Sequence, residues 1–230
     1  SDDRETKNIL RDSYRNPYET LSFFEIKPDM KIVELSPGGG WYTEILANYI
    51  DKQGLLIAAH FDKDTNIPYF KRGRTAFEKK ISTNPMYKNV EIVDLSSELA
   101  KEGSIDAVLT FRNLHNWLGP QMDNIFSNTY KVLKPGGIFG VVEHRANPGT
   151  SMEKMKKSGY VTEEHAIEIA EKHGFTLVSK SEINANPKDT KDYPRGVWTL
   201  PPSLRLKDKD KDKYLEIGES DRMTLLFKKL

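Results

Sequence analysis

The sequence predicts an α/β fold: an open, mostly parallel seven-stranded sheet with helices on both faces and a helical cover at the N-terminus. Short apolar runs bounded by turn residues, typical of buried parallel strands, alternate along the chain with segments of helical spacing. The last two strand-like runs have no helix between them, so we expect them to pair antiparallel at one edge of the sheet. The residues before the first strand are polar and helical in spacing, which predicts the cover.

Each element follows from a local pattern. Strands are expected at residues 31–35, 55–59, 90–93, 105–111, 138–142, 175–183 and 223–227. Helices are expected at residues 3–15, from residue 17 to about residue 26, and at 43–50, 69–81, 121–133 and 161–173. Asn16 and Pro17 form an N-cap and a first helical position, and Gly174 supplies a helix stop. Lys and Asp alternate over residues 207–213, which predicts a solvated loop.

We find no domain boundary within the sheet-forming part of the chain. Residues 1–27 are interpreted as the helical cover and residues 28–230 as one domain. Lys plus Arg number 35 and Asp plus Glu 34, so a net charge of +1 argues against a strongly basic nucleic-acid binder and against an acidic tail protein. Membrane spanning needs an apolar run of about 18 residues, and the sequence has none. The absence of cysteine excludes disulfides, thiolate nucleophiles and thiolate metal sites.

A glycine-rich loop follows the first strand. Glu34 ends that strand, Ser36 and Pro37 lead into Gly38, Gly39 and Gly40, and a helix begins directly afterwards. Glycines permit positive φ and close approach of a ligand, and helix-start N–H groups favour a polar or anionic group. Dinucleotide sites require Gly-x-Gly-x-x-Gly, a spacing that these contiguous glycines do not have. An acid before the loop suits the cationic amine of S-adenosylmethionine (SAM).

These residues resemble a known family. The chain is similar to class I SAM-dependent methyltransferases over about residues 30–227, through Val-Glu-Leu-Ser-Pro-Gly-Gly-Gly at 33–40, Asp-Ala-Val-Leu-Thr at 106–110 and Leu-Lys-Pro-Gly-Gly at 133–137. More narrowly it resembles a group of bacterial predicted methyltransferases of unassigned substrate, through residues 143–145, 196–199 and 218–223. The resemblance implies a seven-stranded, Rossmann-like fold and SAM as the cofactor.

The resemblance also assigns cofactor contacts beyond Glu34 and the glycine loop. Asp94 matches the acid that accepts the adenine amino group, and Asn113 is a candidate for the methionine part. His60 occupies the place of the acid that holds the ribose hydroxyls, with Asp62 two residues later as a possible substitute. Ser36 stands where the first glycine of the loop is usual, which is tolerable if its φ is negative.

The catalytic candidates are polar residues beyond strands four and five. They are His115, Glu143, His144 and Arg145. Methyl transfer is an in-line displacement in which the protein chiefly aligns the reactants, and a general base is needed only for a hydroxyl or acidic-carbon acceptor. Loop packing is the alternative for His115, and a salt-bridged cluster is the alternative for residues 143–145. The histidines show no His-x-x-x-His spacing, so we expect no metal site.

The sequence therefore predicts SAM-dependent methyl transfer to a small-molecule acceptor, with no nucleic-acid or membrane partner and with the oligomeric state open. A catalytically idle SAM-binding module is one alternative, and a nicotinamide-dependent oxidoreductase is a weaker one. The chain begins at Ser1 without methionine, as after removal of an export signal or a tag. A SAM user is expected in the cytoplasm, with an exported mature form as the alternative, because some members of the resembling group carry export signals.

Overall fold

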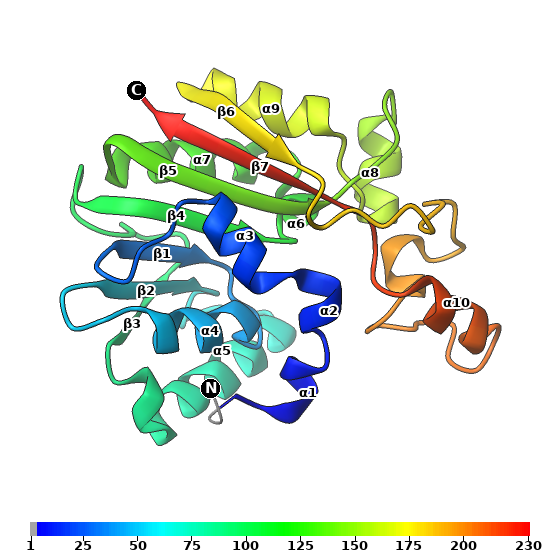
Figure 1. Cartoon of the computed structure of the whole chain (residues 1–230), viewed down its shortest axis with the longest axis horizontal. Helices are drawn as coiled ribbons and strands as arrows, with labels where there is room; N and C mark the ends of the chain where they lie inside the picture. Colours follow the sequence, from blue (N-terminus) through cyan, green and yellow to red (C-terminus); the bar gives the residue numbers. More distant parts are fainter. Residues whose placement is uncertain (1–3) are drawn as a thin grey trace.

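The computed structural model describes residues 4–230 and contains one seven-stranded sheet in the order β3-β2-β1-β4-β5-β7-β6. Its strands are β1 (Lys31–Leu35), β2 (Leu55–His60), β3 (Val90–Asp94), β4 (Ile105–Phe111), β5 (Leu133–His144), β6 (Phe175–Ser181) and β7 (Arg222–Lys229). Strands β1 to β5 are parallel, and β7 pairs antiparallel with both β5 and β6 (Figure 1). The predicted sheet, with its antiparallel pairing at one edge, is confirmed.

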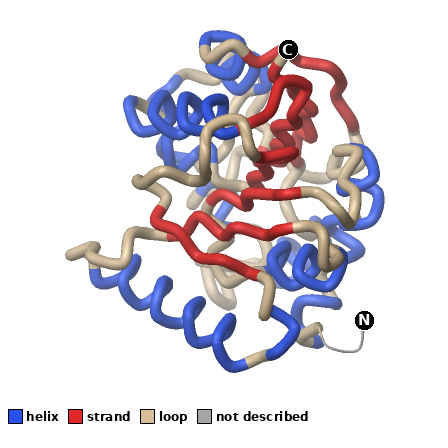
Figure 2. The backbone as a smooth tube through the Cα atoms, turned by 90° about the vertical axis from the view of Figure 1, so that its left-hand side faces the viewer, coloured by secondary structure: helices blue, strands red, loops and turns tan. Residues whose placement is uncertain are grey.

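Helices cover both faces of this sheet, as Figure 2 shows. They are α1 (Thr6–Ile9), α2 (Asp12–Arg15), α3 (Pro17–Phe23), α4 (Trp41–Tyr49), α5 (Pro68–Thr83), α6 (Leu114–Trp117), α7 (Pro120–Val132), α8 (Met152–Ser158), α9 (Glu163–Lys172) and α10 (Lys211–Ile217), with short 3-10 turns at Pro85–Tyr87 and Gly196–Thr199. Alternate strand residues divide the interior into two buried clusters. One packs against α3 and α4, and the other packs against α7 and α9.

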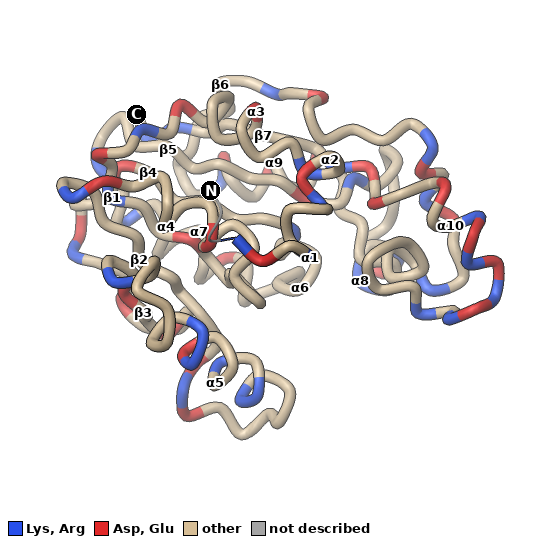
Figure 3. The backbone as a smooth tube through the Cα atoms, turned by 60° about the horizontal axis from the view of Figure 1, so that its bottom comes forward, with Lys and Arg blue, Asp and Glu red and all other residues tan. Residues whose placement is uncertain are grey.

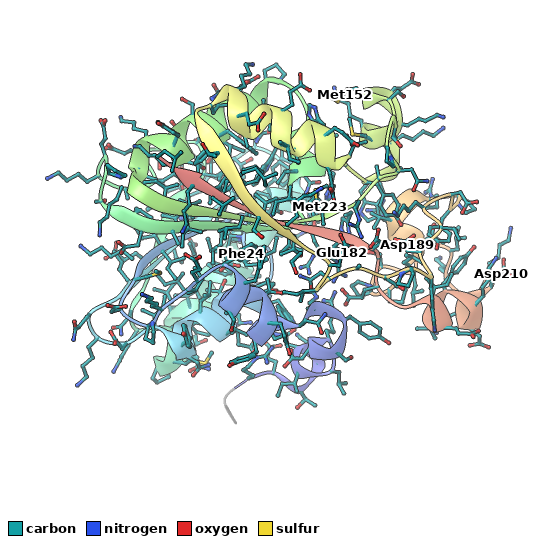
Figure 4. The ribbon with its side chains drawn as sticks, turned by 45° about the horizontal axis from the view of Figure 1, so that its top comes forward. Phe24, Met152, Glu182, Asp189, Asp210 and Met223 are labelled. Atoms are coloured by element: carbon teal, nitrogen blue, oxygen red, sulfur yellow. The ribbon has the colours of Figure 1, made fainter. Side chains whose placement is uncertain are left out.

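The N-terminal segment forms three short helices, of which α3 packs on one face of the sheet. The expected helix over residues 3–15 is broken, because Leu10 ends α1 and α2 begins at Asp12; its first residue, Asp3, lies outside the described residues, as do Ser1 and Asp2. Ion pairs with residues distant in the sequence hold this polar segment in place. Phe24, labelled in Figure 4, is fully buried against the sheet. Pro17 is the first residue of α3, as predicted.

Two other local expectations change in the structure. Residues 207–213 are exposed as expected, but α10 begins within them at Lys211. The Lys-Pro-Gly-Gly turn is a register irregularity inside β5, since Ile105 pairs with Leu133 and Ala107 already pairs with Ile138. Lys and Arg residues are interspersed with Asp and Glu residues along the backbone (Figure 3). Within residues 4–230, every helix is too short or too polar to cross a membrane.

Candidate active site

The candidate site lies at the carboxyl ends of the parallel strands. Strands β1 and β4 are neighbours at the centre of the sheet, and the chain leaves them in opposite directions across it. Ligand crevices in open α/β sheets form at such a switch point. The glycine loop after β1, Asn113 after β4 and Glu143 near the end of β5 therefore meet at one edge.

The loop after β1 combines strain with open space. Ser36, Gly38 and Gly40 all have positive φ, at 49°, 59° and 77°. The condition set for Ser36 from the sequence is therefore not met: its φ is positive, and its buried Oγ has no hydrogen-bond partner among residues 4–230. A Cβ added at Gly38 or Gly39 would meet no atom within 4 Å, so the backbone of Gly39 faces open space.

Hydrogen bonds hold this loop in place. Asn113 Nδ2 donates to the carbonyl oxygens of Leu35 and Ser36 at 3.1 and 3.2 Å, and Gly40 N donates to Pro37 O at 3.0 Å. In this structure Asn113 therefore positions the loop.

Glu34 is buried beneath the loop, with 2% of its surface exposed. Thr43 Oγ1 donates to Glu34 Oε2 at 2.6 Å, and the other carboxylate oxygen makes no hydrogen bond within residues 4–230. Burial raises the Glu34 pKa to about 7, while the Thr43 hydrogen bond and the charge of Arg112 oppose the rise. A cationic amine placed beside this free oxygen would favour the ionised carboxylate.

His60 is engaged within the protein at both ring nitrogens. Phe61 N donates to Nδ1 at 2.8 Å, which leaves Nε2 as the N–H that donates to Gly38 O at 3.0 Å. Burial lowers the His60 pKa, so the ring is neutral. His60 thus supports the glycine loop, while Asp62 lies further along the same edge and accepts from Ser96 N at 3.2 Å.

Two open clefts meet at Phe61, which lines both of them. One cleft, of about 800 Å³, runs over Gly38, Gly39 and Phe77; the other, of about 460 Å³, runs past Asp62 and Leu95. Together they make an elongated site beside the glycine loop. Asp94, the adenine candidate, forms an ion pair with Arg74, whose Nη1 lies 2.7 Å from Asp94 Oδ1. Sequence reasoning did not find Arg74.

His115 and Glu143 form a dyad beyond β4 and β5. His115 Nδ1 lies 3.1 Å from Glu143 Oε1, and the carboxylate also accepts from the backbone N–H groups of His144 at 2.7 Å and His115 at 3.3 Å. Glu143 is fully buried, so it needs these donors. Because an ionised carboxylate only accepts, His115 carries its proton on Nδ1 and presents Nε2 as a base.

His144 lies beside the dyad, with its ring centroid 5.3 Å from that of His115. Its Nδ1 is 2.5 Å from Ser220 Oγ. Burial, the His115 ring and nearby arginines lower the His144 pKa well below its ordinary value, so the ring is neutral. The arrangement therefore gives two neutral imidazoles at one end of the site.

Arg145 points away from this pair, into an acidic cluster. Its guanidinium contacts Asp221 at 2.9 Å, Glu163 at 3.0 Å and Glu182 at 2.7 Å, and these carboxylates raise its pKa. Figure 4 marks Glu182, in the segment that follows β6. This geometry favours the salt-bridged cluster, the alternative interpretation of residues 143–145, for Arg145.

The side chains of His115, Glu143 and His144 also place one potential metal ligand each within 4.8 Å of one another, the only such set found among residues 4–230. Sequence spacing did not reveal this set, because the three residues come from two elements. Sequence reasoning likewise missed a group of arginines, Arg11, Arg15, Arg112 and Arg222, that surrounds Glu219 near His144. Glu219 and Arg222 lie in the motif at residues 218–223, but that motif does not indicate their partners, which lie up to about 200 positions away in the chain.

Comparison with protein families decides between the ligand classes considered for this loop. A profile described as "Methyltransferase domain" matches residues 33–141, the segment from β1 through most of β5. Residues 33–141 carry a methyltransferase domain. This methyltransferase domain includes the glycine loop and the residues that follow β2, β3 and β4.

Curated relatives are similar over about half of the chain. An uncharacterized methyltransferase of Synechocystis sp. (strain PCC 6803) is 31% identical over 135 residues, 56% of this chain and 53% of the relative. A ubiquinone/menaquinone biosynthesis C-methyltransferase of Wigglesworthia glossinidia brevipalpis is 29% identical over 118 residues, 50% of this chain and 43% of the relative. The chain thus spans about half the length of these relatives.

Solved methyltransferase structures share the fold across nearly the whole chain. A SAM-dependent methyltransferase from Aquifex aeolicus has a TM-score of 0.64 at 15% identity and covers 96% of this chain and 93% of its own. A geranyl diphosphate C-methyltransferase from Streptomyces coelicolor, crystallised with S-adenosyl-L-homocysteine (SAH) and Mg²⁺, has a TM-score of 0.65 at 10% identity, covering 94% and 76%. At such identities the likeness concerns the fold.

Proposed function

We propose that this protein transfers the methyl group of SAM to a proton-bearing oxygen or acidic carbon of a small molecule, with His115 as the general base. The observation that carries the proposal is the buried contact of 3.1 Å between His115 Nδ1 and Glu143 Oε1. It fixes the tautomer that leaves Nε2 free to accept a proton, and the carboxylate stabilises the imidazolium that results. Within residues 4–230, His115 Nε2 makes no hydrogen bond.

The cofactor fits the cleft beside the glycine loop. Glu34 would accept the methionine amine, the bare backbone of Gly38 and Gly39 would lie against the cofactor, and Asp62 would take the ribose hydroxyls in place of His60. The open space at Gly39 and the unsatisfied Ser36 Oγ support this placement. SAM supplies a methyl group on a positively charged sulfur, so the bond to be broken is already activated.

The protein then has three tasks: to align the acceptor with the methyl group, to exclude water and to take a proton. His115 Nε2 receives the proton of the attacking group as the new bond to the methyl carbon forms. The ring is held by Glu143 on one side, and it packs edge-on against Trp198, with the two ring centroids 6.0 Å apart. His144, neutral and bonded to Ser220, borders the same space.

Two segments outside the parallel strands are proposed to shape the acceptor pocket, residues 146–160 and 184–217. A cavity of about 340 Å³ between them, bordered by Ala146, Tyr160 and Tyr193, supports this assignment. Relatives named for quinone and sterol C-methylation act on small molecules, which supports an acceptor of that class. Residues 1–27 are proposed to cover the site, because Arg15 of α2 packs at 4.6 Å over Trp41 at the start of α4.

The test uses SAM labelled on its methyl group, incubated with the protein and a cell metabolite extract. Wild-type protein is expected to transfer label to a small organic product. His115→Gln is expected to transfer label about 100- to 10,000-fold more slowly than the wild type while binding SAH normally. Glu143→Gln should lose activity in the same way. His173→Gln, at a histidine bonded to Asp123 away from the site, is the matched control.

The outcomes distinguish the alternatives. SAH binding without any label transfer would make the protein an idle SAM-binding module. Full activity in His115→Gln would show that the acceptor needs no base at this position. Absence of SAH binding, together with a change in NADH fluorescence on mixing, would favour the nicotinamide-dependent enzyme.

A further inference from the structure

The arginine cluster near the site carries more positive charge than the other residues of the described range 4–230 neutralise. Arg11 Nε lies 2.6 Å from Glu219 Oε1, Arg15 Nε lies 3.2 Å from Oε2, and Arg222 Nη2 donates to the same oxygen. Glu219 is 3% exposed, and these contacts hold its pKa below the usual range despite its burial. One buried carboxylate therefore serves three guanidinium groups.

Arg112 adds a fourth charge to this cluster. It directly follows β4, has a φ of +63° and donates its backbone N–H to Val142 O at 2.7 Å. Its half-buried guanidinium forms no hydrogen bond or ion pair within the described residues. Its charge opposes the rise of the Glu34 pKa at one end of the site and contributes to the lowered pKa of His144 at the other.

Two buried guanidinium nitrogens in the cluster also lack partners. Arg15 Nη1 and Arg222 Nε make no hydrogen bond within residues 4–230, although the side chains are only 4% and 2% exposed. Burial together with Arg112 lowers the Arg15 pKa, and burial together with Arg222 lowers the Arg112 pKa to about 10. Charged donors that are buried without acceptors are costly, and such arrangements concentrate at functional sites.

The strand register places this charge next to His144, whose ring lies beside that of the proposed base, His115. Arg222 pairs with His144 across β7 and β5, and Arg112 adjoins the end of β5. SAM does not neutralise the cluster, because its single carboxylate is accompanied by a cationic amine and a cationic sulfur. Glu143 is already held by His115 and two backbone N–H groups. Among residues 4–230, no carboxylate other than Glu219 forms an ion pair with the cluster, so we assign the missing negative charge to a bound molecule.

We infer that Arg15, Arg112 and Arg222 form a binding site for an anionic group, a carboxylate or phosphate, on the methyl acceptor. The inference rests on the proposed function and names its substrate class. An anion there would pair with the unsatisfied N–H groups, and charge-assisted bonds to guanidinium groups are strong and directional. It would also orient the acceptor toward His115 Nε2.

A divalent metal at His115, Glu143 and His144 is the competing occupant of this region. The charges of Arg15, Arg112 and Arg222 all reach His144, so they disfavour a further cation beside it. Both oxygens of Glu143 are also already in use as acceptors. The observations therefore favour an anion over a metal ion.

The test measures anion binding to SAH-saturated protein at constant ionic strength. Inorganic phosphate and benzoate are the probes, each titrated in a chloride-balanced buffer and followed by calorimetry and thermal melting. Wild-type protein is expected to melt at a higher temperature with at least one probe. Arg112→Gln should weaken that binding at least tenfold, whereas Arg195→Gln, at an exposed arginine outside the cluster, should bind as wild type does.

Arg112→Gln is the informative variant because the Arg112 guanidinium makes no hydrogen bond or ion pair within the described residues that the substitution would remove. Without a probe it should melt no lower than the wild type, since a repulsive charge is removed. Normal SAH binding with no response to either probe, or an unchanged response in Arg112→Gln, would overturn the inference and leave the proposed function intact.

Two further arms separate other sources of the effect. If Arg112→Gln weakens SAH but not 5′-methylthioadenosine, which lacks the amino acid part, and neither probe binds the SAH complex, the arginines serve the cofactor carboxylate and the inference fails. In the last arm, Zn²⁺ stabilises the wild type, His115→Gln abolishes that stabilisation, and neither probe binds. That result would show a metal site in place of the anion site.

Discussion

Gly39 is the residue at which cofactor binding can be separated from folding. Its φ is not positive, and an added Cβ would meet no protein atom within 4 Å. Gly39→Ala is therefore expected to leave the melting temperature unchanged. Its methyl group would enter the space assigned to SAM, so we expect SAH to bind about tenfold more weakly, a loss of about 1.4 kcal/mol. Calorimetric titration with SAH measures the affinity.

Gly40→Ala is the matched control, because a Cβ added at Gly40 would meet protein side chains and not the space assigned to SAM. Gly40 has a φ of +77°, and its added Cβ would lie 3.0 Å from Cε2 of Phe77. This variant should lose about 1–3 kcal/mol of stability. Wild-type SAH affinity in Gly39→Ala would mean that the cofactor does not lie against this loop.

Residues whose roles depend on local pattern were predictable from the sequence. Glu34 and the glycines stand together within seven positions, so their proximity follows from a single turn. The positive φ of Ser36 was not predictable, because it depends on how Asn113 holds the loop from the next strand. The ion pair of Arg11 with Glu219 joins residues 208 positions apart, and no local pattern indicates that they meet.

At the scale of elements, α3 is seated on the sheet through a contact that only glycine permits. A Cβ added at Gly140 in β5 would lie 2.9 Å from the Phe24 ring and 2.8 Å from Leu109 Cδ2. Phe24 follows α3 and is fully buried. Gly140→Ala should therefore destabilise the protein by about 1–3 kcal/mol through overpacking, measured by urea denaturation.

A second substitution tests whether this effect belongs to the contact itself. Phe24→Leu removes part of the ring that the new methyl group would meet, so Gly140→Ala should cost less in that background. The expected coupling between the two changes is about 0.5–2 kcal/mol. Strictly additive effects would show that α3 is not held through Gly140.

The strands were predictable because each apolar run is bounded by turn residues and buried by its own pattern. Helix boundaries in the N-terminal segment and at α10 were not, because tertiary contacts override weak local preferences. The break between α1 and α2, for example, accompanies the pairing of Arg4 with Asp12 and of Arg11 with Glu219. A polar segment with few apolar anchors takes its path from such partners.

At the scale of the whole molecule, the sequence predicted an antiparallel edge, but it did not predict that β7 lies inside it. Strand β7 lies between β5 and β6, so the chain enters it at the same edge at which β5 ends. This topology brings Glu219 and Arg222 next to His144. Residues near the C-terminus thus complete the candidate site. Only the pairing of β7 with β5, two strands that are distant in the sequence, positions them.

The buried histidines predict how the stability of the ligand-free protein depends on pH. Burial lowers the pKa of His60 and His144, so below about pH 6.5 the unfolded chain binds protons that the folded protein does not, and stability is lost as the pH falls. Glu34, with a pKa raised to about 7, opposes this loss. Urea unfolding should show a net decrease of at most about 1 kcal/mol between about pH 7.5 and pH 5.5, and His144→Gln should remove or reverse that decrease. If the profile of His144→Gln were the same as that of the wild type, the His144 ring would be hydrated and would titrate normally.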